Sequence, residues 1–344
     1  MRVWFNRTFS SVYTAIKLIR EADTAGRFHL IHSNHNPHSP AGRVAHQFFV
    51  EPTGLDDAAY IDWCLAFCIE HAIAIFFPGK GATLLALEHE RFAAIGTRIC
   101  SVASHANLTM IHDKARFYSE TVLDGAPVAE FAPFETLAEF DAAHAGLRAR
   151  HPVLCVKPSN SVFGLGFAVL DEQRSSAALL IEGVEYHTGL QDFRRGLGEL
   201  GTVRTMLLME YLDGHEYSVD CVADNGRLIA AVARKKPRQA GRGQLIDMRE
   251  DILAATAELA RIYGLSGMFN AQFRESGETV GSNALRLLEI NPRMSGGIGM
   301  ACVAGPILPW IALCGFADGF DNVVVPPVRD GIRVTELTSA VELV

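Results

Sequence analysis

Strand-like and helix-like segments alternate along the first 105 residues, and this alternation limits what the chain can fold into more than any other feature. "RVWFN" and "FHLIHSN" have the pattern of short strands, and the segment between them has the pattern of a helix capped by Ser10 or Ser11 and ending before Gly26. A second helix over residues 56–71 leads to the apolar strand "AIAIFF", a glycine turn and another helix. Such alternation is typical of a parallel sheet covered by helices. The sequence therefore predicts an open parallel α/β domain over residues 1–105.

The pattern changes after residue 105. "PVLCVKPSNSVFGLGFAVLD" consists of a strand, a glycine-containing loop and another strand, and the segment from residue 202 to 236 has the pattern of successive antiparallel strands. A helix, "MREDILAATAELARIYGL", precedes two further strands, "GMFNAQFRES" and "ALRLLEINPR", which a hairpin-like segment separates. We expect an α+β arrangement here, with a linker helix and small subdomain over residues 106–208 and a C-terminal antiparallel-sheet subdomain over residues 209–344.

Composition excludes several classes of protein. Hydrophobic residues make up 49% of the chain and charged residues 20%, which is typical of a globular protein. The 31 basic and 39 acidic residues give a formal net charge of -8, so the surface as a whole does not attract nucleic acid or anionic lipid. The first residues show no apolar run of signal-peptide length, and we therefore expect a cytoplasmic protein without a nucleic-acid or membrane partner.

The polar residues at the end of the last long strand point to a metal. Alternation along "LRLLEIN" directs Glu289 and Asn291 to one face, and Gln272 on the neighbouring strand can reach the same face. Three side-chain oxygens suit a hard cation such as Mg²⁺, which keeps water or phosphate oxygens in its other positions. Taken alone, the pair Glu289 and Asn291 is also compatible with a solvated strand edge or a turn cap.

Five motifs in order resemble the ATP-grasp superfamily, whose members include carbamoyl-phosphate synthetases, D-alanine ligases and biotin carboxylases. They are "DK" after the α/β region, "VKP", a small-residue loop, "MEYLDGHEYSVD" and "EINPR". The resemblance extends over nearly the whole chain. It implies an ATP-grasp fold with an N-terminal pre-ATP-grasp α/β domain, a central lid subdomain and a C-terminal antiparallel-sheet subdomain.

The resemblance also implies which residues bind ATP. Lys114 and Lys157 match the two basic residues that reach the phosphates. The loop "SNSVFGLGF" matches the glycine-rich loop that closes over them, with Ser161, Gly164 and Gly166 as its candidate contacts, although it holds fewer glycines than in many relatives. The main chain of Glu210 and Leu212 falls at the adenine-binding hinge, and Glu216 falls at the ribose position.

The remaining positions implied by the resemblance concern catalysis. Gln272, Glu289 and Asn291 match the magnesium ligands, which in the family hold two ions, and Arg293 matches an arginine beside the transferred phosphate. Glutamine at 272, where many members have an acid, is similar to the carbamoyl-phosphate synthetase pattern. Arg234 continues a strand into the predicted cleft and is a candidate for binding the substrate carboxylate or the γ-phosphate.

These roles predict an ADP-forming ligase that phosphorylates a carboxylate to an acyl phosphate and transfers the acyl group to an amine. The expected partners are small carboxylate and amine substrates, with a homodimer as one option for assembly. Two alternatives remain: a regulatory or scaffold protein that binds ATP without turnover, and an enzyme that phosphorylates bicarbonate or carbamate.

Other segments have a plain structural interpretation beside a functional one. The loop over residues 234–244, with Lys235, Lys236, Arg238 and Arg242, could be a substrate-binding lid or a solvated charged loop, and residues 159–166 are a second candidate lid. The glycines after Arg293 could bring the backbone close to a substrate or form a tight strand-to-helix turn.

Further segments favour structure over function. "PGKG" at 78–81 is expected to be a simple strand-to-helix turn rather than a phosphate loop. His32, His35 and His38 are expected to be surface histidines rather than a metal cluster. The seven cysteines, including Cys64 and Cys68, are expected to be buried free thiols.

Overall fold

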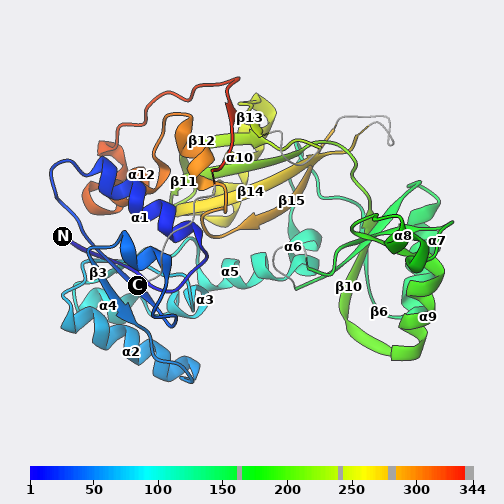
Figure 1. Ribbon diagram of the computed structural model, residues 1–344, viewed down its shortest axis with the longest axis horizontal. Helices are drawn as coiled ribbons and strands as arrows, with labels where there is room; N and C mark the ends of the chain where they lie inside the picture. The colour runs from blue at the N-terminus through cyan, green and yellow to red at the C-terminus, as the bar shows by residue number, and fades with distance from the viewer. Residues whose placement is uncertain (161–164, 239–242, 278–283, 338–344) are drawn as a thin grey trace. The chain divides into compact units, whose positions relative to one another are not determined.

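The computed structural model describes residues 1–160, 165–238, 243–277 and 284–337 (Figure 1). They form three sheets flanked by helices and divide by their contacts into two compact units. The first unit comprises Met1–Thr109, Tyr217–Gln272 and Ile290–Val344, and the second comprises Met110–Glu216 and Phe273–Glu289. The first unit thus combines the start and the end of the chain. The division into three domains at residues 105 and 208 stays a prediction.

The N-terminal sheet has five parallel strands in the order β3-β2-β1-β4-β5, as the alternation of strands and helices predicts. Its strands are β1 (Arg2–Phe5), β2 (His29–Asn34), β3 (Gln47–Val50), β4 (Ile75–Phe77) and β5 (Arg98–Ile99). Its connections contain α1 (Ser11–Ala22), η1 (Pro40–Arg43), α2 (Asp57–Glu70), α3 (Ala82–Leu85) and α4 (His89–Ala94). The sequence did not predict β3 or η1.

Helices cover both faces of this sheet. Alternation along β1 directs Val3 and Phe5 into one core with α1, and Trp4 into another core with α2 and α4. Figure 1 shows α1 and α2 on opposite sides of the sheet. Trp4 stacks on Phe76 of β4 with a centroid distance of 4.0 Å. Burial on both faces explains why these strands are apolar throughout.

The C-terminal sheet has six strands in the order β15-β14-β11-β12-β13-β16. These strands are β11 (Glu216–Asp224), β12 (Arg227–Lys235), β13 (Gln244–Ile246), β14 (Gly267–Glu275), β15 (Leu285–Asn291) and β16 (Arg333–Val334). The associated helices are α10 (Glu250–Tyr263), α11 (Ile298–Val303), α12 (Leu308–Asp318) and η3 (Phe320–Asn322). Both strands predicted from "GMFNAQFRES" and "ALRLLEINPR" are confirmed, and residues 278–283 of the expected hairpin lie outside the described residues.

One core joins the start of the chain to its end. Val222 and Val232 from β11 and β12 are fully buried with Ile16 and Ile19 of α1 and with the apolar residues of α11 and α12. The position of α1 beside α12 in Figure 1 agrees with this shared core. The N-terminal sheet and most of the C-terminal sheet are therefore parts of one unit.

The second unit contains a mixed sheet in the order β6-β10-β7-β8-β9. Its strands are β6 (Phe131–Thr136), β7 (Leu154–Pro158), β8 (Ala168–Asp171), β9 (His187–Gly189) and β10 (Thr202–Glu210), accompanied by α7 (Leu137–Arg148), α8 (Ser176–Ile181) and α9 (Leu190–Leu200). Two further helices, α5 (His105–His112) and α6 (Lys114–Glu120), precede this sheet in the chain. Thr136 and Glu139 form a capping box at the start of α7, and α7 and α9 cover the apolar core of this sheet.

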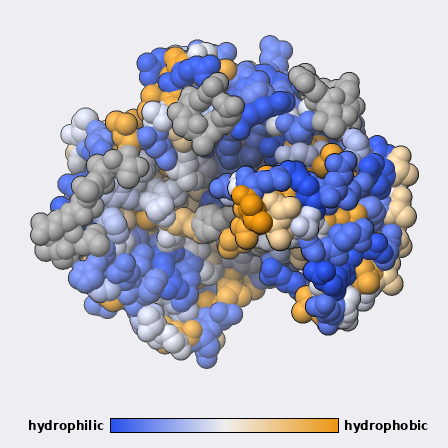
Figure 2. Space-filling model, turned by 45° about the vertical axis from the view of Figure 1, so that its right-hand side comes forward, coloured by the Kyte–Doolittle hydropathy of each residue, from blue (hydrophilic) through white to orange (hydrophobic). Residues whose placement is uncertain are grey.

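The surface visible in Figure 2 is largely hydrophilic, and its hydrophobic residues lie in small scattered groups. Among the described residues, no helix has both the length and the apolar character needed to cross a membrane. All seven cysteines are buried free thiols, as expected. "PGKG" forms the expected strand-to-helix turn between β4 and α3, where Gly81 has a φ of 71°.

The prediction for His32 was wrong, whereas His35 and His38 are exposed as expected. His32 lies inside β2 and is fully buried, with Nδ1 3.0 Å from the carbonyl oxygen of Phe5 and Nε2 3.3 Å from Ser39 Oγ. Burial lowers its pKa to about 4. His32 lies within the predicted strand, and its side chain is buried because both faces of this sheet are covered.

The packing of α12 generates a stability prediction. A Cβ atom at Gly315 would lie 2.2 Å from Phe320 Cδ1, so Gly315→Ala should lower the melting temperature despite a helix-propensity gain of about 1 kcal/mol. A Cβ atom at the exposed Gly146 in α7 would meet no other atom within 4 Å, and Gly146→Ala should raise stability. Differential scanning calorimetry of both variants provides the measurement, and equal stabilisation by both would contradict the packing described here.

Candidate functional site

The first turn of α6 is fixed beside the end of β7. Asp113 caps α6, and its carboxylate accepts two backbone N–H groups of the first turn. Ser159 Oγ donates to Asp113 Oδ1 (2.9 Å), and the Lys114 N–H donates to the Ser159 carbonyl oxygen (3.3 Å). Ser159 directly follows β7, the strand that carries Lys157. The local structure therefore brings the two predicted phosphate-binding lysines to neighbouring positions.

Lys157 is held by an aromatic side chain. Its Nζ donates to Tyr118 Oη (2.7 Å) and lies 4.7 Å from the centroid of the Tyr118 ring. The Tyr118 hydroxyl in turn donates to the Leu288 carbonyl oxygen on β15. No carboxylate of the described residues lies within 4 Å of Lys157 Nζ. Tyr118 was not predicted from the sequence, although its position four residues after Lys114 in a helix places both on one face.

Glu289 is the carboxylate that accompanies the two lysines. Lys114 Nζ lies 3.8 Å from Glu289 Oε2. Burial lowers the pKa of Lys114, with Glu289 opposing that effect and Lys157 adding to it, and burial also lowers the pKa of Lys157. The structure thus brings Lys114, Lys157 and Glu289 together. Such a site can accommodate an additional anion such as a phosphate.

The side chain of Glu210, the last residue of β10, is buried in an ionic cluster. One carboxylate oxygen lies 3.2 Å from His151 Nδ1, and the other lies 3.3 Å from Arg286 Nε. These contacts occupy the side chain, and the hinge role of the main chain at Glu210 and Leu212 stays a prediction. Within the described residues the Leu212 N–H makes no hydrogen bond, which fits a donor for a nucleobase. His151 and Arg286 were not predicted from the sequence. The signal for Arg286 is a charged residue inside the apolar alternation of "LRLLEIN".

The other predicted nucleotide contacts are placed as follows. Glu216 is the first residue of β11 and is partly buried. Gly166 has a φ of 82°, and a Cβ there would lie 2.8 Å from Pro158 Cγ, so this position favours glycine. Ser161 and Gly164 lie outside the described residues.

Arg234 in the first unit is buried in a polar cluster and is only 2% exposed. Its Nη2 lies 2.8 Å from Asp220 Oδ2 and donates to Ser218 Oγ and Ser295 Oγ, and its Nη1 donates to Gln244. Its charge is therefore matched by Asp220, and its contact with Ser295 connects it to the loop after Arg293. Its role as a catalytic residue stays a prediction. Arg242 and residues 239–241 of the same basic loop lie outside the described residues.

The predicted metal ligands provide oxygen donors but only one carboxylate. Gln272 Nε2 donates to Asn270 Oδ1 (3.4 Å), which leaves the Gln272 amide oxygen as a possible ligand. Alternation along β15 directs Glu289 and Asn291 to the same face of the strand. Within the described part of the chain, no three His, Cys, Asp or Glu side chains cluster as a metal site would require. One carboxylate and two amides fit a hard cation that takes its remaining ligands from phosphate or water.

Arg293, the predicted arginine beside the transferred phosphate, lies in the first unit. Its guanidinium carbon is 4.3 Å from the centroid of Phe9, and its Nη1 donates to the Met294 carbonyl oxygen (3.0 Å). Phe9 belongs to the loop between β1 and α1. Arg293 is therefore packed on the loop at the carboxyl end of β1.

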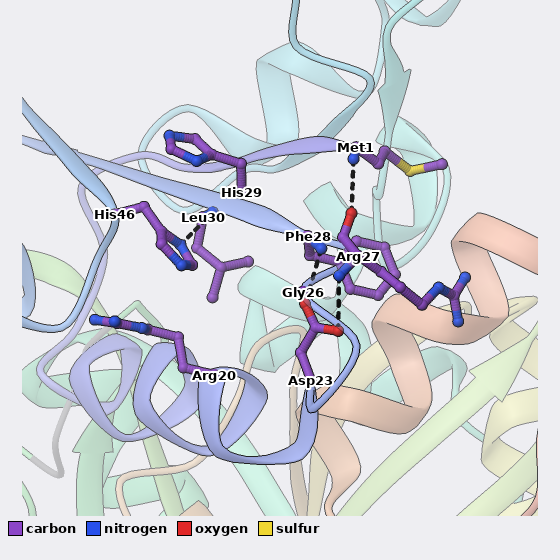
Figure 3. A pocket seen from close by; sticks show the side chains of 9 residues that line it. All are labelled: Met1, Arg20, Asp23, Gly26, Arg27, Phe28, His29, Leu30 and His46. Carbon is purple, nitrogen blue, oxygen red and sulfur yellow. Dashed lines mark hydrogen bonds between the residues drawn. The ribbon is translucent and has the colours of Figure 1, made fainter.

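A cavity of about 290 Å³ lies elsewhere in the first unit (Figure 3). Its lining includes Arg20, Arg27, His29 and His46, at the amino-terminal ends of the first two strands. Arg27 is paired with Asp318 outside the cavity lining. Ligands of open α/β sheets bind at the carboxyl ends of the strands, so this cavity lies at the other end of the sheet from the expected ligand position.

Comparisons with known proteins agree with the motifs. Residues 202–340 match the family "ATP-grasp in the biosynthetic pathway with Ter operon". No curated protein matches the sequence. The solved structure of N5-carboxyaminoimidazole ribonucleotide synthetase in complex with ADP is similar with a TM-score of 0.66 and 12% identity, over 97% of this chain and 79% of that one.

Two further solved structures are similar. The L-amino acid ligase from Bacillus licheniformis has a TM-score of 0.60 and 13% identity, over 94% of this chain and 77% of that one. The biotin carboxylase domain of 2-oxoglutarate carboxylase from Hydrogenobacter thermophilus, in complex with MgADP, ADP and bicarbonate, has a TM-score of 0.60 and 14% identity, over 90% and 68%. Likeness at these identities shows the ATP-grasp fold, and the family match covers the part with the last motifs. The chain therefore has the ATP-grasp fold, and its residues 202–340 match an ATP-grasp family.

Proposed function

We propose that the protein is an ADP-forming ligase that activates a carboxylate as an acyl phosphate and transfers the acyl group to an amine. The observation that carries this proposal is the pair of neighbouring ammonium groups on Lys114 and Lys157, with Glu289 beside Lys114. Two positive charges in partly buried surroundings suit the phosphates of ATP. The ADP complex of the similar synthetase supports the same nucleotide.

Mg²⁺ is the proposed metal partner of ATP. The oxygens of Gln272, Glu289 and Asn291 would hold it, and it would neutralise charge on the phosphates when bound. The MgADP complex of the similar biotin carboxylase domain supports this choice. The low count of carboxylates in the set suits a site in which phosphate oxygens contribute to binding.

The proposed chemistry has two steps. A carboxylate oxygen attacks the γ-phosphorus of ATP, the bond from that phosphorus to the ADP oxygen breaks, and ADP leaves. The amine nitrogen then attacks the carbonyl carbon, phosphate leaves with the former carboxylate oxygen, and the nitrogen loses a proton. Lys114 and Lys157 would position the phosphates, and Arg293 would neutralise charge on the phosphoryl group during transfer. Arg234 would act by holding Ser295 in the loop after Arg293.

Bicarbonate is a second candidate for the phosphorylated substrate. The similar biotin carboxylase domain contains bicarbonate in its complex, and Gln272 matches the carbamoyl-phosphate synthetase pattern. The L-amino acid ligase favours a carboxylate with an amine acceptor instead. The two candidates share the phosphoryl transfer and differ in the acceptor that replaces phosphate.

Substitutions should separate nucleotide binding from turnover. Lys157→Met removes a charge that would contact a phosphate, so MgATP should bind about tenfold or more weakly in titration calorimetry. Glu289→Gln should retain binding but slow ADP formation by about 10²-fold, because a preorganised electrostatic contact is lost. Lys17→Met, which removes an exposed lysine on α1, is the matched control. Near-normal ADP formation by Glu289→Gln would refute the proposed role of Glu289.

Nucleotide binding should also take up protons at alkaline pH. Burial lowers the pKa of Lys114 and Lys157 in the free protein, and bound phosphates should raise both pKa values again. Affinity should therefore fall as pH rises from the lowered pKa values towards the ordinary lysine pKa of about 10.5. Calorimetry near pH ~9 in two buffers of different ionisation heat measures the uptake. Lys157→Met should reduce it, and proton release on binding would contradict the proposed phosphate contacts.

Isotope transfer tests the acyl phosphate. With a carboxylate substrate labelled with ¹⁸O, one labelled oxygen should appear in the released phosphate, because the bridging oxygen leaves with phosphorus. Mass spectrometry of the phosphate detects the label, and hydroxylamine in place of the amine should give a hydroxamate. Labelled bicarbonate as the only productive substrate would favour the second candidate, and formation of AMP and pyrophosphate would exclude both.

A further inference from the structure

The connections of the N-terminal sheet reverse direction between β1 and β4. From β1 the chain proceeds outward to β2 and β3, and it then returns to the other side of β1 to form β4 and β5. Ligands of open α/β sheets bind outside the carboxyl ends of the strands at such a reversal. The loop after β1, residues 6–10, and the loop after β4, residues 78–81, therefore flank the expected ligand position of this sheet.

Buried polar groups join these two loops. The Lys80 N–H donates to the Arg7 carbonyl oxygen (2.7 Å), and Asn6 Nδ2 donates to the Lys80 carbonyl oxygen (3.0 Å). The Gly79 N–H donates to Asn6 Oδ1 (2.5 Å). A Cβ at Gly79 would lie 2.3 Å from Thr8 Cβ, so the close approach of the loops requires glycine there. The geometry of both loops is fixed by these contacts.

A buried carboxylate accepts a hydrogen bond from the backbone of the loop after β1. Glu51 is 2% exposed, and it accepts hydrogen bonds from the Arg7 N–H (2.6 Å), Ser33 Oγ (2.9 Å) and the Tyr60 hydroxyl (3.3 Å). Asn6 Nδ2 donates to the same Tyr60 oxygen (2.9 Å). Supporting hydrogen bonds of this kind hold the residues of a binding site in place before the ligand arrives.

Two cationic side chains on these loops have no carboxylate partner in the part of the chain that the structure describes. Arg7 Nη1 lies 2.8 Å from His35 Nδ1, and Lys80 Nζ lies 3.8 Å from the centroid of the Tyr60 ring. Both side chains are partly buried, and no carboxylate of the described residues lies within 4 Å of either cation. Many other arginines of the first unit are paired with carboxylates, as Arg27 is with Asp318.

We propose that Arg7 and Lys80 bind an anionic group, a carboxylate or a phosphate, that one substrate carries at a distance from its reacting group. This assignment of a substrate class rests on the proposed ligase function. Phe9, two residues after Arg7 on the same loop, contacts Arg293. Arg7 thus shares a loop with the residue that contacts the arginine proposed to act in phosphoryl transfer, and Lys80 lies on the loop that is hydrogen-bonded to it. A substrate with a second anionic group matches this arrangement better than a monocarboxylic acid or a simple amine.

Matched pairs of probes test which substrate carries the anion. Glutarate and pentanoate differ only in a second carboxylate, and 4-aminobutyrate and butylamine differ in the same way on the amine side. Their dissociation constants, and that of inorganic phosphate, are measured by calorimetry with the protein saturated with MgADP. For at least one pair, the wild-type protein should bind the member with the additional anionic group more tightly.

The variants Arg7→Gln and Lys80→Gln should weaken that binding by about tenfold or more, because each removes a charge-assisted hydrogen-bond donor. They should not change the dissociation constants of MgADP or of the pair member that lacks the additional anionic group. Lys17→Gln on the exposed face of α1 should change none of these dissociation constants. Unchanged binding of every anionic probe in both variants would overturn the proposal even if the protein forms ADP. A different outcome is also possible: the protein forms no ADP with any acid, but the two variants lose anion binding. That result would overturn the ligase function and would still support the anion site.

Discussion

The proximity of two partly buried ammonium groups is the constraint on which the proposed nucleotide site depends. An ammonium group loses hydration when it is partly buried, and its pKa falls unless a negative group replaces the water. Lys114 Nζ lies 3.8 Å from the carboxylate of Glu289, and Tyr118 supplies a ring face and a hydroxyl oxygen to Lys157. Burial lowers the pKa of both lysines, and Glu289 opposes that effect. A bound phosphate group would supply the missing negative charge, so binding and charge compensation are coupled.

The presence or absence of a carboxylate partner also distinguishes cationic groups that stabilise the structure from those proposed to bind ligands. Arg234 is almost completely buried, and Asp220 matches its charge at 2.8 Å, so this pair stabilises the loop that contains Ser295. Arg7 and Lys80 have no such carboxylate among the described residues. The carboxylate of Glu51 accepts hydrogen bonds from the Arg7 N–H, Ser33 and Tyr60, and these three donor groups are uncharged. We therefore interpret Arg234 as a positioning group and Arg7 and Lys80 as binding groups.

The shared core of the first unit provides the frame for these loops. The loop with Arg7 leads directly into α1, and the loop with Arg293 leads into α11. The two helices pack closely, since a Cβ at Gly299 in α11 would lie 3.1 Å from Thr14 Cγ2 in α1. The start and the end of the chain are thus held together by apolar packing, which preserves the contact between Phe9 and Arg293.

Much of the fold followed from local patterns in the sequence. Apolar period and glycine positions predicted the parallel sheet, β14 and β15, because side-chain alternation and turn preferences act over a few residues. Motif order predicted the ATP-grasp fold and singled out Lys114, Lys157 and Glu289, which the structure brings together. The short strand β3 and the burial of His32 were not predicted, because both depend on neighbouring strands rather than on local pattern.

The charge balance of each site could not be derived from the sequence. Tyr118 contacts Lys157, and Glu51 supports the backbone of Arg7, across separations of 39 and 44 residues. Residue types and periods are local properties, and the sequence states them directly. Burial and the distance between charges arise only when remote segments meet, and because electrostatic energy depends on both, the folded structure decides which cations are matched and which are left for a ligand.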